Sequence, residues 1–92
     1  MRSKIFNDVL MEEVVIHKFK MPSYTDFYKF KFEEFDQWRE SEKGKWIIDR
    51  VQGVTEHSYR DYEMDGQVVI FTGFLKPADK TFMLLKWPKN NS

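Results

Sequence analysis

Two apolar runs close to the C-terminus, residues 67–75 and 81–87, constrain the fold of this chain more than any other feature. The first run is rich in β-branched and aromatic residues, which suit a pleated surface, and both runs are too short for independent helices. Between them, Pro77 presets a turn-like φ angle and Asp79 can hydrogen-bond its own backbone. The pattern therefore predicts a β-hairpin in which residues 76–80 reverse the chain.

The chain has 92 residues, which is enough for a single domain over residues 1–92 with one modest core. It contains no cysteine, which excludes disulfides and thiolate chemistry and is typical of a reducing compartment. The first residues lack the apolar segment of a signal peptide, and no apolar run is long enough to cross a membrane. We therefore expect a cytoplasmic protein without membrane contact, whose last residues, 88–92, are disordered.

Formal charge is zero overall but unevenly placed along the chain. Residues 1–32 carry six Lys and Arg against four Asp and Glu, residues 33–65 carry five against ten, and residues 66–92 carry four against one. Such asymmetry can steer a charged partner or orient self-assembly. Chance scatter over a solvated surface is the simpler explanation.

The first third of the chain predicts one helix and two strands. An apolar stripe at i, i+1, i+4 and i+5 begins at Ile5, with Ser3 as a suitable N-cap, and predicts a helix over residues 3–12. Residues 14–21 are typical of a strand that Pro22 ends. Residues 27–32 alternate aromatic and basic side chains, which predicts a second strand paired with the first through a turn at 22–26.

Residues 33–48 are ambiguous. Acidic residues at the start and a Lys43-Gly44 ending suit a helix over residues 33–43, with Gly44 at the C′ position. The same glycine also suits the turn of a hairpin over residues 34–48. We favour the helix.

Residues 46–51 predict a strand, residues 54–63 predict a solvent-facing or edge strand, and Asp65-Gly66 predicts a tight turn. Together these elements predict an α+β fold: an antiparallel sheet of about five strands, largely a meander, with one or two helices on one face. A small all-β barrel is the alternative.

Signatures of catalysis or metal binding are scarce. The four glycines are too scattered for a phosphate-binding loop, and His17 and His57 lie 40 residues apart, so we expect no metal and no cofactor. The one enzymatic alternative is a weak ribonuclease with His57 as general base and Arg60 as phosphate ligand. Polar pairs on an exposed strand explain these residues more simply.

Lysines interleaved with aromatic residues suggest a surface for nucleic acid. Lysine neutralises phosphates, and flat rings offer stacking platforms for unpaired bases. The candidate contacts to single-stranded RNA are Lys18, Lys20, Tyr28, Lys29 and Lys31. The alternation itself allows a second interpretation, in which the rings form the core and the lysines its solvated cover.

Sixteen aromatic residues are many for so short a chain and suggest a protein-binding or self-association surface. Candidate partner contacts are Trp38, Tyr59, Arg60 and Tyr62, and an open edge strand at 54–63 favours a homodimer. A core built from large side chains would explain the aromatic residues equally well.

From these patterns we expect a small, non-enzymatic regulatory or inhibitory protein. It would act stoichiometrically on single-stranded RNA or on a host protein. Short phage and viral inhibitors are often of this size and composition. A homo-oligomeric structural protein is a further alternative.

Overall fold

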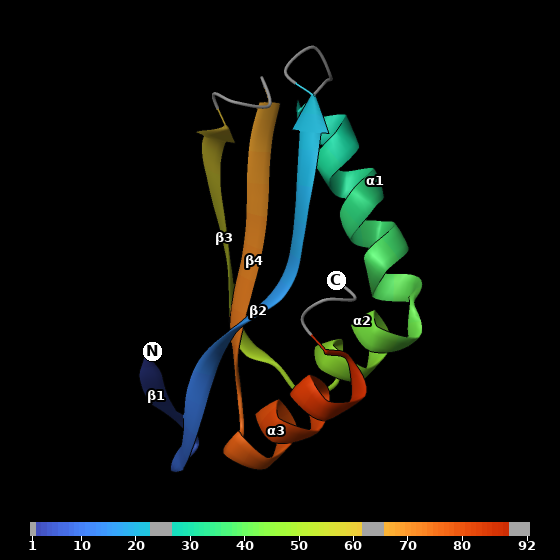
Figure 1. Ribbon diagram of the computed structural model, residues 1–92. Coiled ribbons are helices and arrows are strands. Elements are labelled where there is room, and N and C mark those ends of the chain that lie inside the picture. The colour runs from blue at the N-terminus through green and yellow to red at the C-terminus, as the bar shows by residue number, and fades with distance from the viewer. Residues whose placement is uncertain (1, 23–26, 62–65, 89–92) are drawn as a thin grey trace.

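The computed structural model describes residues 2–22, 27–61 and 66–88, and in these ranges the chain forms an α+β fold (Figure 1). Within them, four antiparallel strands form one curled sheet in the order β1-β2-β4-β3, and three helices are present. In chain order the elements are β1 (Ser3–Phe6), β2 (Val9–Pro22), α1 (Phe27–Glu40), α2 (Glu42–Ile48), β3 (Gln52–Asp61), β4 (Gly66–Leu75) and α3 (Pro77–Lys86).

The N-terminal residues form a hairpin, so the predicted helix over residues 3–12 is wrong. Ile5 pairs with Leu10 across β1 and β2, and the neighbouring positions pair in the same register. Asn7 and Asp8 have φ angles of 50° and 64° and make the turn. Asn and Asp tolerate this left-handed region, and such turns match the twist of the strands. The apolar spacing that resembles a helical stripe arises here from cross-strand partners.

The strand predicted over residues 14–21 is confirmed as part of the longer β2, which ends at Pro22 as expected. β2 pairs with β4 along most of its length, with a bulge between Val15 and His17. The bulge inserts Ile16 as an extra residue. Ile16 is buried in the core, and the His17 ring stacks on Trp38 of α1. Both side chains therefore lie on the helix side of the sheet.

Residues 27–40 and 42–48 are helical, which contradicts the strands predicted at 27–32 and 46–51 and excludes the hairpin at 34–48. The favoured helix over residues 33–43 is confirmed, because α1 and α2 cover that range except for Ser41. Phe30, Phe35 and Trp38 lie on the face of α1 that packs against the core. The alternation at 27–32 is thus part of an amphipathic helix, and no strand there pairs with β2. The turn predicted at 22–26 falls mostly on residues 23–26, outside the described residues.

Gly44 lies inside α2, not at a helix end. Ser41 is the N-cap of α2, and its hydroxyl accepts a hydrogen bond from the Gly44 backbone N–H at 3.0 Å. At the other end of α2, Ile47 is fully buried (0% exposed). Burial of Ile47 in the core overrides the strand preference of the Trp46-Ile47-Ile48 sequence.

The predicted C-terminal hairpin is half right. Residues 67–75 belong to β4, an interior strand, but residues 81–87 belong mainly to α3. Pro77 opens this helix at its first turn, where a missing N–H costs nothing, with Asp79 in the first turn and Lys86 in the last. The edge strand predicted at 54–63 is confirmed over the described residues as β3. Of the tight turn predicted at Asp65-Gly66, Asp65 lies outside the described residues and Gly66 is the first residue of β4.

The sheet is not a meander, because β4 lies between β2 and β3. Its curl is shared with the barrel alternative, but the helices place the fold in the α+β class (Figure 1). The core lies between one face of the sheet and the helices. Its buried residues are Val14, Ile16, Phe19, Met21, Trp38, Ile47, Val69, Phe71, Leu75 and Met83.

Candidate nucleic-acid interface

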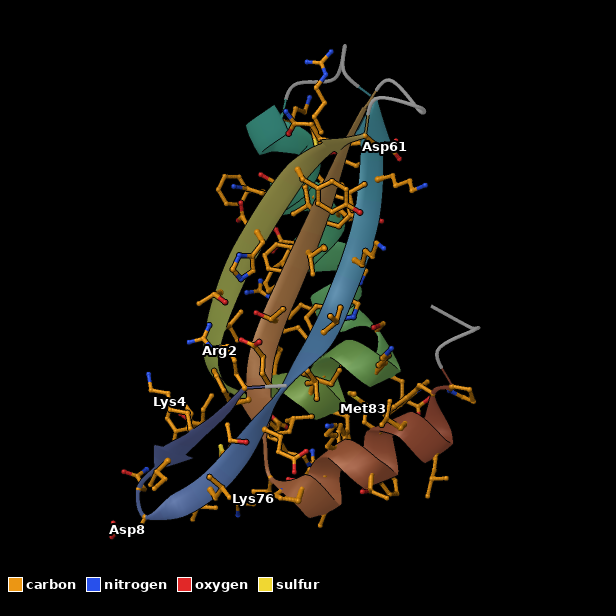
Figure 2. All side chains as sticks on the ribbon, turned by 60° about the vertical axis from the view of Figure 1, so that its left-hand side comes forward. Arg2, Lys4, Asp8, Asp61, Lys76 and Met83 are labelled. Atoms are coloured by element: carbon orange, nitrogen blue, oxygen red, sulfur yellow. The ribbon has the colours of Figure 1, made fainter. Side chains whose placement is uncertain are left out.

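The face of the sheet opposite the core carries the candidate site. Figure 2 shows β2, β4 and β3 side by side, with α1 behind them. Directly opposed residues on antiparallel strands point to the same face, so the strand register defines rows of side chains across the sheet. One row on the helix-free face is Lys20, Val68 and Tyr59, and the next is Lys18, Ile70 and His57. Each row therefore runs from a cation to an aliphatic residue to a ring, and these six residues are the open-face patch.

The side chains on β2 and β3 at the two sides of the open-face patch are more exposed than those on β4 in its middle. Tyr59 is 51% exposed, and Lys18, Lys20 and His57 are also exposed. Val68, in the middle of its row, is only 1% exposed. Because neighbouring strands lie about 4.8 Å apart, the lysines of β2 and the rings of β3 are separated by roughly 10 Å. The patch is thus a shallow platform with a cationic side and an aromatic side.

Polar contacts hold parts of this face in place. Lys20 lies 3.8 Å from the Asp61 carboxylate, and the Thr55 hydroxyl lies 3.3 Å from the His57 ring and 2.9 Å from the Thr72 hydroxyl. No ion pair of Lys18 is found among the described residues. Lys18 is therefore the side chain of this face most ready to meet an incoming anion.

The sequence-predicted lysine cluster is split by the fold. Lys18 and Lys20 share the open face, but Lys29 and Lys31 lie on α1, behind the sheet. Lys31 is ion-paired with Glu56 at 3.2 Å, and its side chain is 11% exposed. Tyr28 lies on α1 as well. The rings that do join Lys18 and Lys20 come from β3, and sequence reasoning missed this because it did not place β4 between β2 and β3.

The predicted partner contacts also separate. Tyr59 lies in the open-face patch, whereas Arg60 is opposite Gln67 and Met21 in register and so points to the helix side. Trp38 is 8% exposed and belongs to the core. Tyr62 lies outside the described residues. Of the four, Tyr59 alone is on the open face among the residues the structure describes.

The histidines lie on opposite faces of the sheet. Within residues 2–22, 27–61 and 66–88, no group of three His, Cys, Asp or Glu side chains is placed to hold a metal. The His57 ring contacts the Thr55 hydroxyl at 3.3 Å, which is not the carboxylate that the general-base arrangement requires. Arg60 points to the other face. The ribonuclease arrangement of His57 with Arg60 is therefore not assembled on one surface.

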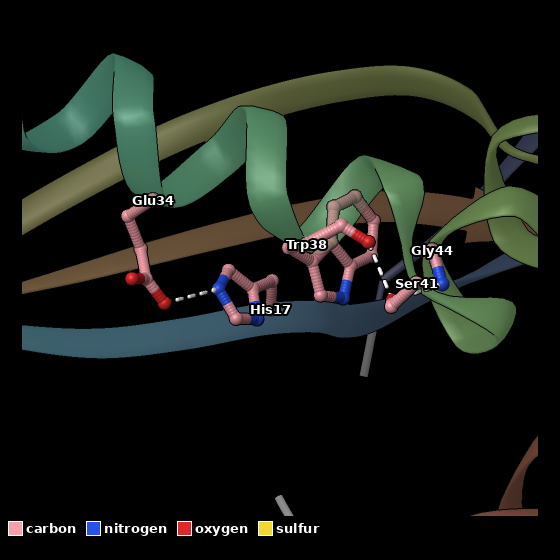
Figure 3. Close-up of polar contacts among 5 residues, drawn as sticks. All are labelled: His17, Glu34, Trp38, Ser41 and Gly44. Carbon is pink, nitrogen blue, oxygen red and sulfur yellow. Dashed lines mark hydrogen bonds and ion pairs between the residues drawn. The ribbon is translucent and has the colours of Figure 1, made fainter.

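His17 forms a half-buried cluster with α1 (Figure 3). Its ring stacks on Trp38 with centroids 5.1 Å apart, and Nε2 lies 3.3 Å from a Glu34 carboxylate oxygen. Burial lowers the pKa of His17 below its ordinary value of 6.5; the hydrogen bond and charge of Glu34 oppose this shift, and Lys43 adds to it. The net direction favours the neutral ring in the folded protein.

We expect the folded protein to lose stability as the pH falls below about 6.5 because of His17. The unfolded chain binds the proton more readily than the folded one, so the loss begins near the ordinary pKa and is complete below the folded pKa. Urea unfolding at a series of pH values should show a smaller decline for His17→Phe than for the wild type. The exposed-site control His57→Gln should keep the wild-type decline, and equal declines for His17→Phe and wild type would contradict this account.

In the described ranges, none of the helices is long and apolar enough to span a membrane. Comparison of the chain with protein-family models, with curated proteins and with solved structures found no match.

Proposed function

We propose that this protein is a cytoplasmic, non-enzymatic protein that binds single-stranded nucleic acid, RNA in the first instance, on the helix-free face of its sheet. It acts stoichiometrically, as a small regulatory or inhibitory factor. The observation that supports the proposal is the pair of parallel rows in the open-face patch, each with a lysine on β2 and a ring on β3.

The lysine side of the patch supplies affinity for the phosphate backbone. Lys18 and Lys20 are two positions apart on β2, so they share a face and lie about 7 Å apart along the strand. This distance is close to the spacing of phosphates in an extended single strand. Each phosphate neutralised releases counterions, which makes binding sensitive to salt. A strand lying along β2 would therefore place successive phosphates over the two lysines.

The ring side of the patch supplies the preference for single strands. Tyr59 and His57 lie across β4 from the lysines, and Tyr59 is half-exposed. A ring can stack on a base only when the base is not already stacked in a duplex. Val68 and Ile70 form an apolar floor between phosphates and bases. Recognition of this kind is tolerant of sequence, because every base has a flat face.

The salt dependence of binding tests the proposal. Fluorescence anisotropy of a labelled oligo(U) RNA of about ten nucleotides should show a log–log slope of about −1.4, the value for two phosphates on a single strand. A duplex of the same length should bind more weakly. Absence of binding to the single strand at low salt would overturn the proposal.

Tyr59→Ala should weaken oligo(U) binding by roughly 5- to 150-fold, because one stacking contact is worth about 1–3 kcal/mol. The salt slope should stay unchanged, since no phosphate contact is lost. Phe32→Ala is the matched control: Phe32 is 61% exposed but lies on α1. If both variants bind like the wild type, Tyr59 is not a stacking platform.

The proposal includes no catalytic step. Labelled RNA incubated with the protein should therefore remain intact, and His57→Ala should behave in the same way. Cleavage by the wild type that His57→Ala abolishes would restore the ribonuclease alternative.

A second candidate function, binding of a host protein, is favoured by exposed apolar side chains away from the open-face patch. Leu85 on α3 is 78% exposed, and the cross-strand partners Ile5 and Leu10 are 66% and 54% exposed. Contiguous exposed apolar groups mark protein contacts, and Ile5 and Leu10 are neighbours across the hairpin. Affinity capture from host lysate with and without nuclease separates the candidates, because a protein partner survives nuclease treatment and RNA-bridged partners are lost.

A further inference from the structure

β3 is an unusually open sheet edge. It is ten residues long and pairs on one side with β4, and among the described residues no strand pairs with its other side. Figure 1 shows β3 as the outermost strand on its side of the sheet. An edge strand presents a row of backbone N–H and C=O groups that can pair with another strand. The opposite edge is different, because β1 has only four residues.

Several of the usual protections of a sheet edge are missing from most of β3. Proteins shield edges with proline, bulges, very short strands or charged side chains, lysine above all. In β3 the register irregularity lies between Gln52 and Thr55, next to Gly53 with its φ of 61°. From Thr55 to Asp61 the register with β4 is regular, and this segment contains neither proline nor lysine. Seven consecutive residues are therefore available for pairing.

We propose that β3 pairs with β3 of a second copy of this chain, antiparallel and about a twofold axis at Ser58. This register is the one that pairs the whole regular segment with itself, Thr55 opposite Asp61 of the second copy. A twofold axis perpendicular to the sheet keeps each side chain on its own face, so opposed residues meet on the same face.

The register is self-complementary in charge. It sets Glu56 opposite Arg60 of the second copy, and by symmetry Arg60 opposite Glu56, both on the helix side. On the open face it sets His57 opposite Tyr59. Glu56 keeps its ion pair with Lys31 at 3.2 Å, since a carboxylate can accept bonds from two cations. Opposite charges directly opposed across strands stabilise the pairing, and like charges oppose it.

The dimer has one consequence that rests on the proposed function. Its sheet runs without interruption from β1 of one copy to β1 of the other, with both helix-free faces on the same side. The rings of both open-face patches then meet at the centre, and the lysines flank them on β2 of each copy. A single strand long enough to cross the dimer would contact both patches.

Charge-reversal variants test the pairing. Sedimentation equilibrium of the wild type from about 5 to about 500 µM should show reversible association to twice the monomer mass, as a small interface gives. Glu56→Arg and Arg60→Glu should each dimerise roughly tenfold more weakly, because each places two like-charge pairs across the interface. Mixed in equal amounts, the two variants should form a heterodimer, since each Arg then faces a Glu. The helix-side control Lys45→Glu should dimerise like the wild type.

Each contrary result overturns the inference. The inference is wrong if the wild type stays monomeric at the highest concentration or associates beyond the dimer. It is also wrong if both charge variants dimerise like the wild type. The same holds if the mixture fails to associate although circular dichroism shows both variants to be folded. RNA binding is measured separately with a short oligo(U). A wild type that dimerises but does not bind this RNA overturns the proposed function and not the dimer.

Discussion

Replacing Gly44 by alanine should lower the free energy of unfolding by roughly 3 kcal/mol, the upper range for overpacking a tight site. A Cβ at this position would lie 1.9 Å from the Trp38 carbonyl oxygen and 2.8 Å from its carbon. Both are backbone atoms, so rotation of a side chain cannot relieve the contact. Either α2 must move away from the end of α1 or the helix must distort.

Helix propensity alone would predict the opposite, a gain in the free energy of unfolding. In an ordinary helix interior, alanine is more favourable than glycine by about 1 kcal/mol. Here Ser41 is the only residue between α1 and α2, and its backbone N–H donates to the Trp38 carbonyl at 3.0 Å. The junction is shown in Figure 3, where Gly44 lies close to Ser41. The tight turn fixes how closely the first turn of α2 passes Trp38.

Thermal unfolding measures the effect. For a domain of this size, a loss of about 3 kcal/mol corresponds to a fall in Tm of roughly 12–24 °C. The neighbouring control Lys45→Ala changes an exposed residue of the same helix and should move Tm by little. A Gly44→Ala protein as stable as the wild type, or more stable, would contradict the observed α1–α2 junction.

Removing both open-face lysines should weaken oligo(U) binding by about 25-fold at about 0.1 M salt, the contribution of two single-strand phosphates relative to about 1 M. The variant is Lys18→Gln with Lys20→Gln. The log–log salt slope should fall from about −1.4 towards zero. Because both side chains are exposed and the Lys20–Asp61 pair is a surface pair at 3.8 Å, stability should change little.

A matched double variant separates position from net charge. Lys45→Gln with Lys76→Gln removes the same charge from exposed residues of α2 and of the link between β4 and α3. Its affinity and salt slope should stay close to those of the wild type. Equal losses in the two double variants would mean that general electrostatic attraction, and not the open-face patch, binds the RNA.

Three of the strands, β2, β4 and β3, are predictable from the composition of their own residues. β2 and β4 follow from their β-branched runs, and the edge character of β3 follows from its polar composition. Helices were missed where aromatic residues resembled strand patterns. Over ranges as short as 27–32 and 81–87, the spacing of rings and leucines fits both the strand period of two residues and the helix period of about 3.6. Packing against the sheet decides in favour of helix. Pro77 was the available signal, because proline opens helices as readily as it forms turns.

The candidate site depends on strand order, which the chain reveals only through long-range pairing. Lys18 and Lys20 were identified from the sequence as nucleic-acid contacts, and His57 and Tyr59 were named there with other roles. Their meeting was not predicted, since a meander would have placed other strands beside β2. The insertion of β4 between β2 and β3 brings the two pairs into common rows. Tertiary pairing of this kind has no local sequence signature.

Mapping the contact surface by NMR tests the central claim most directly. In ¹⁵N–¹H spectra of the wild type titrated with oligo(U), the largest amide shifts should fall on Lys18, Lys20, His57, Tyr59 and Ile70. Amides of α3 should stay in place. Shifts concentrated on the helices, or no shifts at saturating RNA, would contradict binding on the helix-free face.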